Sequence, residues 1–286
     1  SRGLGDVYKR QTSHGIDERL TNEHKRVLGG ALVGTTIEWF DFFIYAQAAG
    51  LIFATQFFNP VAQESPGLAQ IIAWASIGIS FLFRPFGAIL AGHLGDRLGR
   101  KPVLVLTLVG MGLATFLMGL LPNYESWGIA APILLVVLRI VQGMSAGGEW
   151  GGAALIAVEH APGLRRGYFG AFPQLGVPLG MMLAAIMMLT LTAAMTPEQF
   201  EAWGWRIPFL SSLALILVGV FIRRSVEESP VFTEMEQLRE RSSAPLKDLF
   251  AGHSKLVGQC ALIFAGNNAA GYPVSYTHLT LPTNRE

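Results

Sequence analysis

The chain has 286 residues, of which 51% are hydrophobic and only 14% are charged, and its mean hydropathy is +0.42. Soluble domains carry about a quarter charged residues, so this composition indicates an integral membrane protein. The formal net charge of +1 excludes the strongly basic surface that nucleic-acid binding requires, so no nucleic-acid partner is expected. The single cysteine, Cys260, excludes an intrachain disulfide or a thiolate metal site.

Both ends of the chain differ in character from its middle. Residues 1–11, SRGLGDVYKRQ, and 274–286, VSYTHLTLPTNRE, resemble translated adaptor sequence, so we expect neither to take part in the fold. The second follows an apolar segment directly, which predicts that the natural gene continues beyond residue 273. Residues 12–26 would then form a cytoplasmic N-terminal segment. No signal peptide is expected, because acidic residues lie in the middle of the first apolar stretch.

Six segments are apolar over the roughly 20 residues that a helix needs to cross a bilayer. A polar cytoplasmic linker follows them at 224–255, and a partial seventh span is expected at 256–273. The predicted fold is therefore an all-α integral membrane protein with a six-helix N-terminal domain at 27–223. Its spans lie near 27–53, 68–92, 103–122, 128–157, 167–195 and 205–222.

Basic residues occur in every second connection between these spans. The connections near 54–67, 123–127 and 196–204 contain no Lys or Arg. Because short cytoplasmic loops carry an excess of Lys and Arg, the pattern predicts that the N-terminus and the basic connections lie in the cytoplasm. Their cations are Arg19, Lys25, Arg26, Arg97, Arg100, Lys101, Arg165, Arg166, Arg223 and Arg224.

The connection after the second span, GHLGDRLGRKPVL (92–104), concentrates charge between two apolar stretches. The predicted orientation explains its cations but not the acid Asp96. An acid beside arginines can form an ion pair that opens and closes, so Asp96 suggests a latch; the alternative is an ordinary solvated loop. Glycines permit a tight turn here, and Pro102 suits the first turn of the next helix. The residues of this predicted gate are Gly92, Asp96, Arg97, Gly99, Arg100 and Lys101.

Five ionisable residues lie inside the predicted spans, where a charge costs about 2.5–3.5 kcal/mol at the bilayer centre. Asp41 lies roughly 21 Å into the first helix, and Arg139 roughly 17 Å into the fourth, which runs the other way. Both reach the middle of a core about 30 Å thick, so we expect them to pair. Glu38 shares the helical face of Asp41. The other two residues are Arg84 and Glu149.

A carboxylate beside an arginine can act as a proton switch. The cation keeps the carboxylate ionised, and when the arginine turns to an anionic substrate, the desolvated carboxylate binds a proton instead. Asp41, Glu38 and Arg139 are accordingly the predicted proton-coupling residues. The alternative is a buried ion pair that only ties two helices together.

The remaining charges leave alternatives open. Arg84 can face the substrate cavity and attract anions, or pair with Glu149 or Asp96 near the gate. Glu149 lies in the inner third of the fourth helix, where gating is favoured over substrate contact. Glu159 lies at the next basic loop and is expected to pair with the basic loops, or else to be solvated.

An alternative of another class is a membrane-embedded hydrolase or acyltransferase, because GMSAG (143–147) fits the nucleophile pattern G-x-S-x-G. That pattern needs a strand–turn–helix context, whereas Ser145 lies in a predicted helix whose small residues favour close packing. We therefore predict that the protein is not an enzyme. The histidines show no metal-ligand spacing and the sequence has no phosphate-binding loop, so we expect no metal and no cofactor other than a proton gradient.

Several motifs together resemble one superfamily of membrane proteins. GHLGDRLGRKPVL is similar to the signature loop of the major facilitator superfamily, and RIVQGMSAGGEWGGAA (139–154) resembles its fourth-helix motif. Other segments resemble the metabolite:proton symporter branch, whose members carry proline and betaine, shikimate, 2-oxoglutarate and citrate. These segments are GTTIEWFDFFIY (34–45), RPFGAILAGHLGDRLGRK (84–101), GGEWGGAALIAVEHAP (147–162) and GWRIPFL (204–210).

The resemblance implies a fold of twelve helices, of which this chain would hold the N-terminal half and the start of the seventh. It implies a monomeric symporter in the bilayer of the bacterial cytoplasmic membrane, which moves a small organic acid or zwitterion together with protons. A sugar porter is an alternative, because EESPVF (227–232) is similar to the sequence after helix six of those proteins. Glu159 matches a cytoplasmic acid of related carriers and is the last residue of the predicted gate. The substrate-binding candidates are Arg84, Arg139, Gln142, Gln174 and Asn267.

Overall fold

In a computed structural model, the chain forms two compact units, Ser1–Arg239 and Glu240–Glu286. In the second unit a helix covers residues 253–263, with nearly all of its side chains exposed. This helix overlaps the beginning of the predicted seventh span. The described residues are 20–58, 65–162, 165–225, 253–263 and 266.

Some of the predictions fall outside the described residues. These are the adaptor-like ends 1–11 and 274–286, nearly all of the linker 224–255, and the substrate candidate Asn267. The predicted seventh span also lies outside them from residue 264 onward, apart from Gly266. All of these stay predictions.

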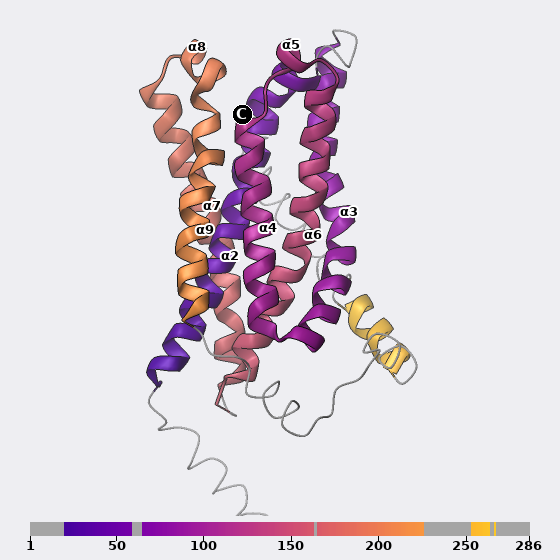
Figure 1. The fold of residues 1–286 in the computed structure, drawn as a ribbon, viewed down its shortest axis with the longest axis vertical. Coiled ribbons are helices and arrows are strands. Elements are labelled where there is room, and N and C mark those ends of the chain that lie inside the picture. Colours follow the sequence, from indigo (N-terminus) through magenta and orange to yellow (C-terminus); the bar gives the residue numbers. More distant parts are fainter. Residues whose placement is uncertain (1–19, 59–64, 163–164, 226–252, 264–265, 267–286) are drawn as a thin grey trace, which may run out of the picture. The chain divides into compact units, whose positions relative to one another are not determined.

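Six long helices make up the first unit (Figure 1). In the described part of the chain, these six are long and apolar enough to cross a membrane, and each covers one of the predicted apolar segments completely or to within two residues at one end. The same residues include no β-strand, so the prediction of an all-α membrane protein is confirmed. The helices are α2 (Asn22–Ala48) with its π-helical continuation η1 (Ala49–Phe58), α3 (Pro66–Leu98), α4 (Arg100–Leu120), α6 (Ala130–Glu159), α7 (Arg166–Ala194) and α9 (Arg206–Arg224).

The two ends of this bundle differ in charge. At one end lie the starts of α2, α4 and α7 and the ends of α3, α6 and α9 (Figure 1). The opposite end carries the short elements α5 (Tyr124–Trp127), α8 (Pro197–Gln199) and η2 (Phe200–Gly204). We call the first the basic end, because it carries Lys25, Arg26, Arg97, Arg100, Lys101, Arg165, Arg166, Arg223 and Arg224.

Local sequence sets where these helices begin and end. α2 starts before its apolar segment because Thr21 and His24 form a capping box, with the His24 N–H donating to Thr21 Oγ1 at 3.2 Å. Only Gly99 separates α3 from α4. Its φ of 105° is a conformation that other residues rarely adopt, so a glycine is required at this turn, as the sequence predicts.

The helices pack in pairs around a polar interior. α3 lies along α6, α2 lies along α7, and α4 contacts both α6 and α9. The largest apolar core lies toward the opposite end, where aromatic rings from α2, η1 and α9 meet edge to face. Buried ionisable side chains lie between this core and the basic end. The core rings include Tyr45, Phe53, Phe57, Trp205 and Phe209.

Glycines allow α3 and α6 to touch through their backbones. A Cβ atom on Gly143 would overlap the Ser80 backbone, and one on Gly147 would overlap the backbone of Arg84. The small residues around Ser145 therefore have the packing role that the sequence predicts. Close approach of this kind is a common way for membrane helices to associate.

The glycine contact between α3 and α6 predicts opposite effects for two matched substitutions. Gly147→Ala is expected to destabilise the protein by about 1–3 kcal/mol, because the added methyl group forces the helices apart. Gly151→Ala lies one turn further along α6 with no atom near the added methyl group, so it should stabilise the helix by up to about 1 kcal/mol. Thermal unfolding in detergent measures both. Equal shifts of Tm would contradict the packing role.

Candidate functional site

The gate motif lies at the basic end, where α3 passes into α4. Arg100 Nη1 lies 3.0 Å from Asp96 Oδ1, and Arg100 Nη2 lies 3.8 Å from Glu159 Oε1 at the end of α6. Lys101 Nζ donates a hydrogen bond to the Arg224 carbonyl oxygen at the end of α9, at 2.8 Å. Asp96 thus pairs within its own loop and Glu159 with a basic loop, and the motif joins the ends of four helices. Whether this junction opens and closes stays a prediction.

One face of α2 carries a column of residues that runs from the basic end toward the aromatic core. Gly34, Glu38, Asp41 and Tyr45 follow one another at spacings that place them on the same side of the helix. The three side chains are buried, and each meets polar groups from other helices. We call these four residues the α2 polar face.

Asp41 lies in the middle of this face, and its carboxylate accepts two hydrogen bonds. Thr115 Oγ1 of α4 donates to one oxygen at 2.8 Å, and Ser212 Oγ of α9 donates to the other at 2.7 Å. The carboxylate is completely buried. Because hydroxyl groups satisfy both oxygens, a buried charge is tolerated here without direct contact with a cation.

A polar chain links Asp41 to Arg139, in place of the predicted direct ion pair. Gln142 Nε2 donates to Thr115 Oγ1 at 2.7 Å, and the Gln142 side-chain carbonyl accepts a hydrogen bond from Arg139 Nη1. The expected direct pairing is therefore corrected: Thr115 and Gln142 stand between the two charges. The position of each residue along its helix places both at a similar depth in the membrane. That depth does not reveal the side chains of α4 and α6 that lie between them.

Arg139 has one edge that remains available. Its guanidinium lies 3.7 Å from the centre of the Tyr45 ring, and only 1% of the residue is exposed. Nη1 contacts Gln142, whereas Nε and Nη2 have no hydrogen-bond partner among the described residues. These two nitrogens form the planar edge of an arginine that binds a carboxylate in a two-pronged manner.

Glu38 pairs with Arg84 of α3, at 3.3 Å. This corrects both of the ion pairs that the sequence offered for Arg84, with Glu149 or with Asp96. The Arg84 guanidinium also lies 4.7 Å from the centre of the Phe81 ring, and about a fifth of its side chain is exposed. A cavity of about 10 Å³ brings four of the predicted site residues together, namely Glu38, Arg84, Arg139 and Gln142.

Glu149 forms a second buried ion pair, with Arg223 of α9. Both side chains are at least 95% buried, and Arg223 contacts both carboxylate oxygens, one of them at 2.7 Å. Arg223 also donates to the Leu104 carbonyl oxygen, and the Thr107 hydroxyl donates to Glu149 at 3.1 Å. From the sequence, Arg223 was predicted only to be one of the cations that set the orientation of the helices across the membrane. The feature of the sequence that could have predicted this pair is Glu149 itself, because a buried carboxylate needs a cation at the same depth in the membrane.

The family described as "Sugar (and other) transporter" matches residues 28–265 of the chain. The chain belongs to this family. The match covers the six helices and continues into the second unit. The predicted membership of the major facilitator superfamily is confirmed, because the sugar (and other) transporter family belongs to that superfamily.

Curated relatives of this family member are named as transporters of metabolites. It is 42% identical over 262 residues to the inner membrane metabolite transport protein YhjE of Escherichia coli, covering 92% of this chain and 59% of the relative. It is 43% identical to the shikimate transporter of Escherichia coli, covering 74% and 48%. It is 38% identical to a putative proline/betaine transporter of Staphylococcus aureus, covering 88% and 53%. The chain thus spans about half the length of the curated relatives it matches.

Solved structures similar to this family member share its fold at low sequence identity. The inward-open xylose transporter XylE of Escherichia coli matches with a TM-score of 0.65 and 18% identity, over 92% of this chain and 57% of that structure. The proton:xylose symporter XylE bound to 6-bromo-6-deoxy-D-glucose matches with a TM-score of 0.69 and 17% identity, over 91% and 57%. The six helices therefore have the fold of the major facilitator superfamily.

The transporter family also bears on the remaining candidates. Its members are transporters, which confirms the prediction that the chain is not an enzyme. Ser145 lies within α6 rather than on a turn after a strand. In the described part of the chain no cluster of three His, Cys, Asp or Glu residues could hold a metal. Gln174 is exposed on α7 and does not line the cavity at Glu38. The exposed Arg97 lies in the last turn of α3.

Proposed function

We propose that the protein is a proton-coupled symporter of a small organic anion or zwitterion, which works by alternating access in the bacterial cytoplasmic membrane. The basic end would face the cytoplasm, as the excess of Lys and Arg there favours. The transporter would act as a monomer in the bilayer and need no cofactor beyond the proton gradient. One observation carries this proposal: the chain Asp41–Thr115–Gln142–Arg139, which ends on an arginine edge that has no hydrogen-bond partner among the described residues.

This chain gives a physical route from substrate to proton. A substrate carboxylate that binds Nε and Nη2 of Arg139 would draw the guanidinium toward itself and weaken the hydrogen bond from Nη1 to the Gln142 side-chain carbonyl. Gln142 then turns its side-chain carbonyl toward Thr115, and the Thr115 hydroxyl donates to that carbonyl instead of to Asp41. A buried carboxylate that loses a donor is better satisfied as the neutral acid. Substrate and proton would therefore each favour the binding of the other, as linkage requires.

Glu38 and Arg84 supply further charge beside the same cavity. Arg84 is partly exposed and can attract an anion toward Arg139, while Glu38 can accept the positive group of a zwitterion. Two arginines beside one cavity favour a substrate with a carboxylate over an uncharged sugar. A sugar as the transported substrate is the outcome that would replace this part of the proposal.

Transport by the full-length protein that contains this sequence tests the proposed coupling. Reconstituted in proteoliposomes with an inward proton gradient, it is expected to accumulate a carboxylic acid or zwitterion from a panel that also contains neutral sugars. A protonophore should abolish the accumulation. Accumulation that continues with the protonophore present would refute proton coupling, and uptake of sugars alone would refute the substrate class.

A further inference from the structure

The ion pair between Glu149 and Arg223 has no part in the substrate route proposed above. It rests directly against Gly34 of the α2 polar face, because a Cβ atom at Gly34 would overlap both the Arg223 guanidinium and the Glu149 carboxylate. Gly34 precedes Glu38 by one helical turn, and such neighbours lie about 5–6 Å apart. The ion pair is therefore the next ionisable group after Glu38 on the way to the basic end.

A cavity of about 150 Å³ lies between α3, α4 and α6. Neither Glu149 nor Arg223 lines it, but Leu104 does, and its carbonyl oxygen accepts a hydrogen bond from Arg223. Gly148, the neighbour of Glu149, lines it together with Gly92 and Gly95 of the gate motif. About 10–15 Å³ of such a cavity holds one water molecule, so this one has room for several. It extends from the level of Glu149 to the basic end.

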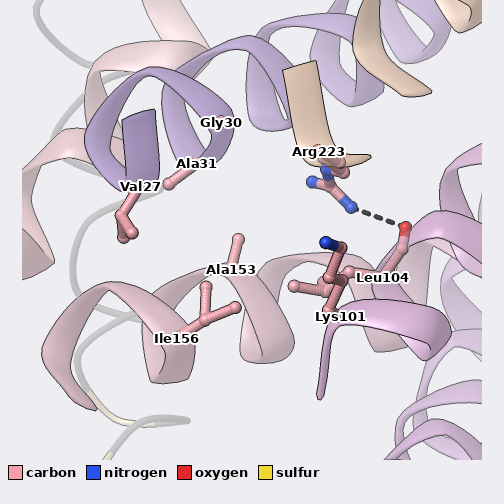
Figure 2. A pocket seen from close by; sticks show the side chains of 8 residues that line it. All are labelled: Val27, Gly30, Ala31, Lys101, Leu104, Ala153, Ile156 and Arg223. Atoms are coloured by element: carbon pink, nitrogen blue, oxygen red, sulfur yellow. Dashed lines mark hydrogen bonds between the residues drawn. The ribbon is translucent and has the colours of Figure 1, made fainter. Parts of the chain in front are cut away.

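A smaller cavity of about 20 Å³ lies between α2, α4, α6 and α9, which is enough for one water molecule. Figure 2 shows Arg223 and Lys101 projecting toward it from one side, with Val27 and Ala31 of α2 across from them. The hydrogen bond from Arg223 to the Leu104 carbonyl oxygen lies at its edge (Figure 2). The ion pair thus lies between the dry interior and space that water can enter.

We propose that Glu149 is the relay carboxylate through which the coupled proton leaves the α2 polar face for the basic end. The inference rests on the proton coupling proposed above. The proton passes from Asp41 to Glu38, then leaves the Glu38 carboxyl group and binds a Glu149 oxygen, with one water molecule spanning the gap. Glu38 is left ionised beside Arg84, and Arg223 keeps its charge throughout. Glu149 then gives the proton to water on the side of the basic end and pairs again with Arg223.

The groups that face Glu149 suit this role. From α9 comes one cation, Arg223, and from α4 comes the neutral hydroxyl of Thr107. α2 presents Glu38 one helical turn from Gly34, which contacts the ion pair, and α3 faces this part of α6 with Ala91, which carries no charge. Among the described residues for which a contact with Glu149 is shown, Arg223 is the only cation, so a proton that arrives there competes with that one charge.

A contact whose only role is to hold α6 and α9 together would not need charged residues at this place. Removing two charges from water costs several kcal/mol for each ion, and an apolar pair of similar volume holds helices together at least as well. The ion pair therefore calls for a role that only ionisable groups can have.

The experiment compares three forms of the full-length protein in proteoliposomes: wild type, Glu149→Gln, and the double variant Glu149→Gln with Arg223→Met. The double variant removes both charges, so no buried charge is left without its partner. We expect both variants to lose proton-driven uptake by at least about 100-fold, while exchange of internal for external substrate, which needs no net proton transfer, falls far less. Glu125→Gln, an exposed acid of α5, is the matched control.

Each outcome distinguishes a proton relay at Glu149 from an ion pair that only holds α6 and α9 together. Normal proton-driven uptake by the double variant would overturn the inference, because no carboxylate would then be needed at residue 149. A double variant that is too unstable to reach the membrane would also count against it, because the charges would then be required to hold α6 and α9 together. If the wild type accumulated substrate to the same level with a protonophore present, the proposed function would instead be refuted.

Discussion

Replacing Arg139 with glutamine is expected to raise the half-saturating concentration of a carboxylate substrate by at least about 100-fold. Nε and Nη2 of Arg139 have no hydrogen-bond partner among the described residues, and a carboxylate would accept a charge-assisted bond from each. Each such bond contributes about 1.5–3 kcal/mol, and every 1.4 kcal/mol is about a factor of ten in affinity. Initial rates of uptake by the full-length protein, measured over a range of substrate concentrations, give this value.

A series at the same residue separates charge from geometry. Arg139→Lys keeps the charge but loses the planar edge and the contact with the Tyr45 ring, so it should restore little of the affinity. Arg166→Gln is the control, because this arginine is exposed at the start of α7. Full affinity in Arg139→Lys would show that the site recognises the substrate by charge alone and does not need the planar guanidinium edge. Full affinity in Arg139→Gln would remove Arg139 from substrate binding.

Replacing Asp41 with asparagine is expected to abolish accumulation against a gradient while leaving exchange of substrate across the membrane. Asparagine has nearly the same shape, and its carbonyl can still accept the hydrogen bond from Thr115, but it cannot bind the coupled proton. A gradient of one pH unit stores about 1.4 kcal/mol for one proton per substrate. The wild type should therefore reach about tenfold accumulation, and the variant should stop at equal concentrations.

The measurement for Asp41→Asn is uptake into proteoliposomes at an imposed gradient of one pH unit, followed by exchange of labelled substrate without a gradient. Glu125→Gln, which removes an exposed carboxylate from α5, should accumulate substrate like the wild type. If Asp41→Asn also accumulated substrate, the proton would bind elsewhere on the α2 polar face. Glu38→Gln would then be the variant that loses accumulation.

The buried polar groups show where reading the sequence was sufficient and where it was not. Asp41, Glu38, Arg84, Arg139 and Glu149 stood out in advance, because a charge in an apolar span needs a compensating interaction. Their partners were harder to assign. Thr115 and Ser212 resemble many small polar residues of membrane helices, and nothing in their sequence surroundings marks them as the donors to Asp41.

The amino-acid sequence was enough to predict the six helices, their order, the glycine turn at Gly99 and the glycine contact along α6. These features depend on the composition of about 20 neighbouring residues or on the conformation of a single one, which are local properties. The folded structure was needed to show that Arg84 pairs with Glu38, that Arg223 pairs with Glu149, and that Thr115 and Gln142 separate Asp41 from Arg139. The depth of a residue follows from its place in a helix, but its neighbours depend on how each helix is rotated and which helix lies beside it. Those two properties are set by the packing of all the helices at once.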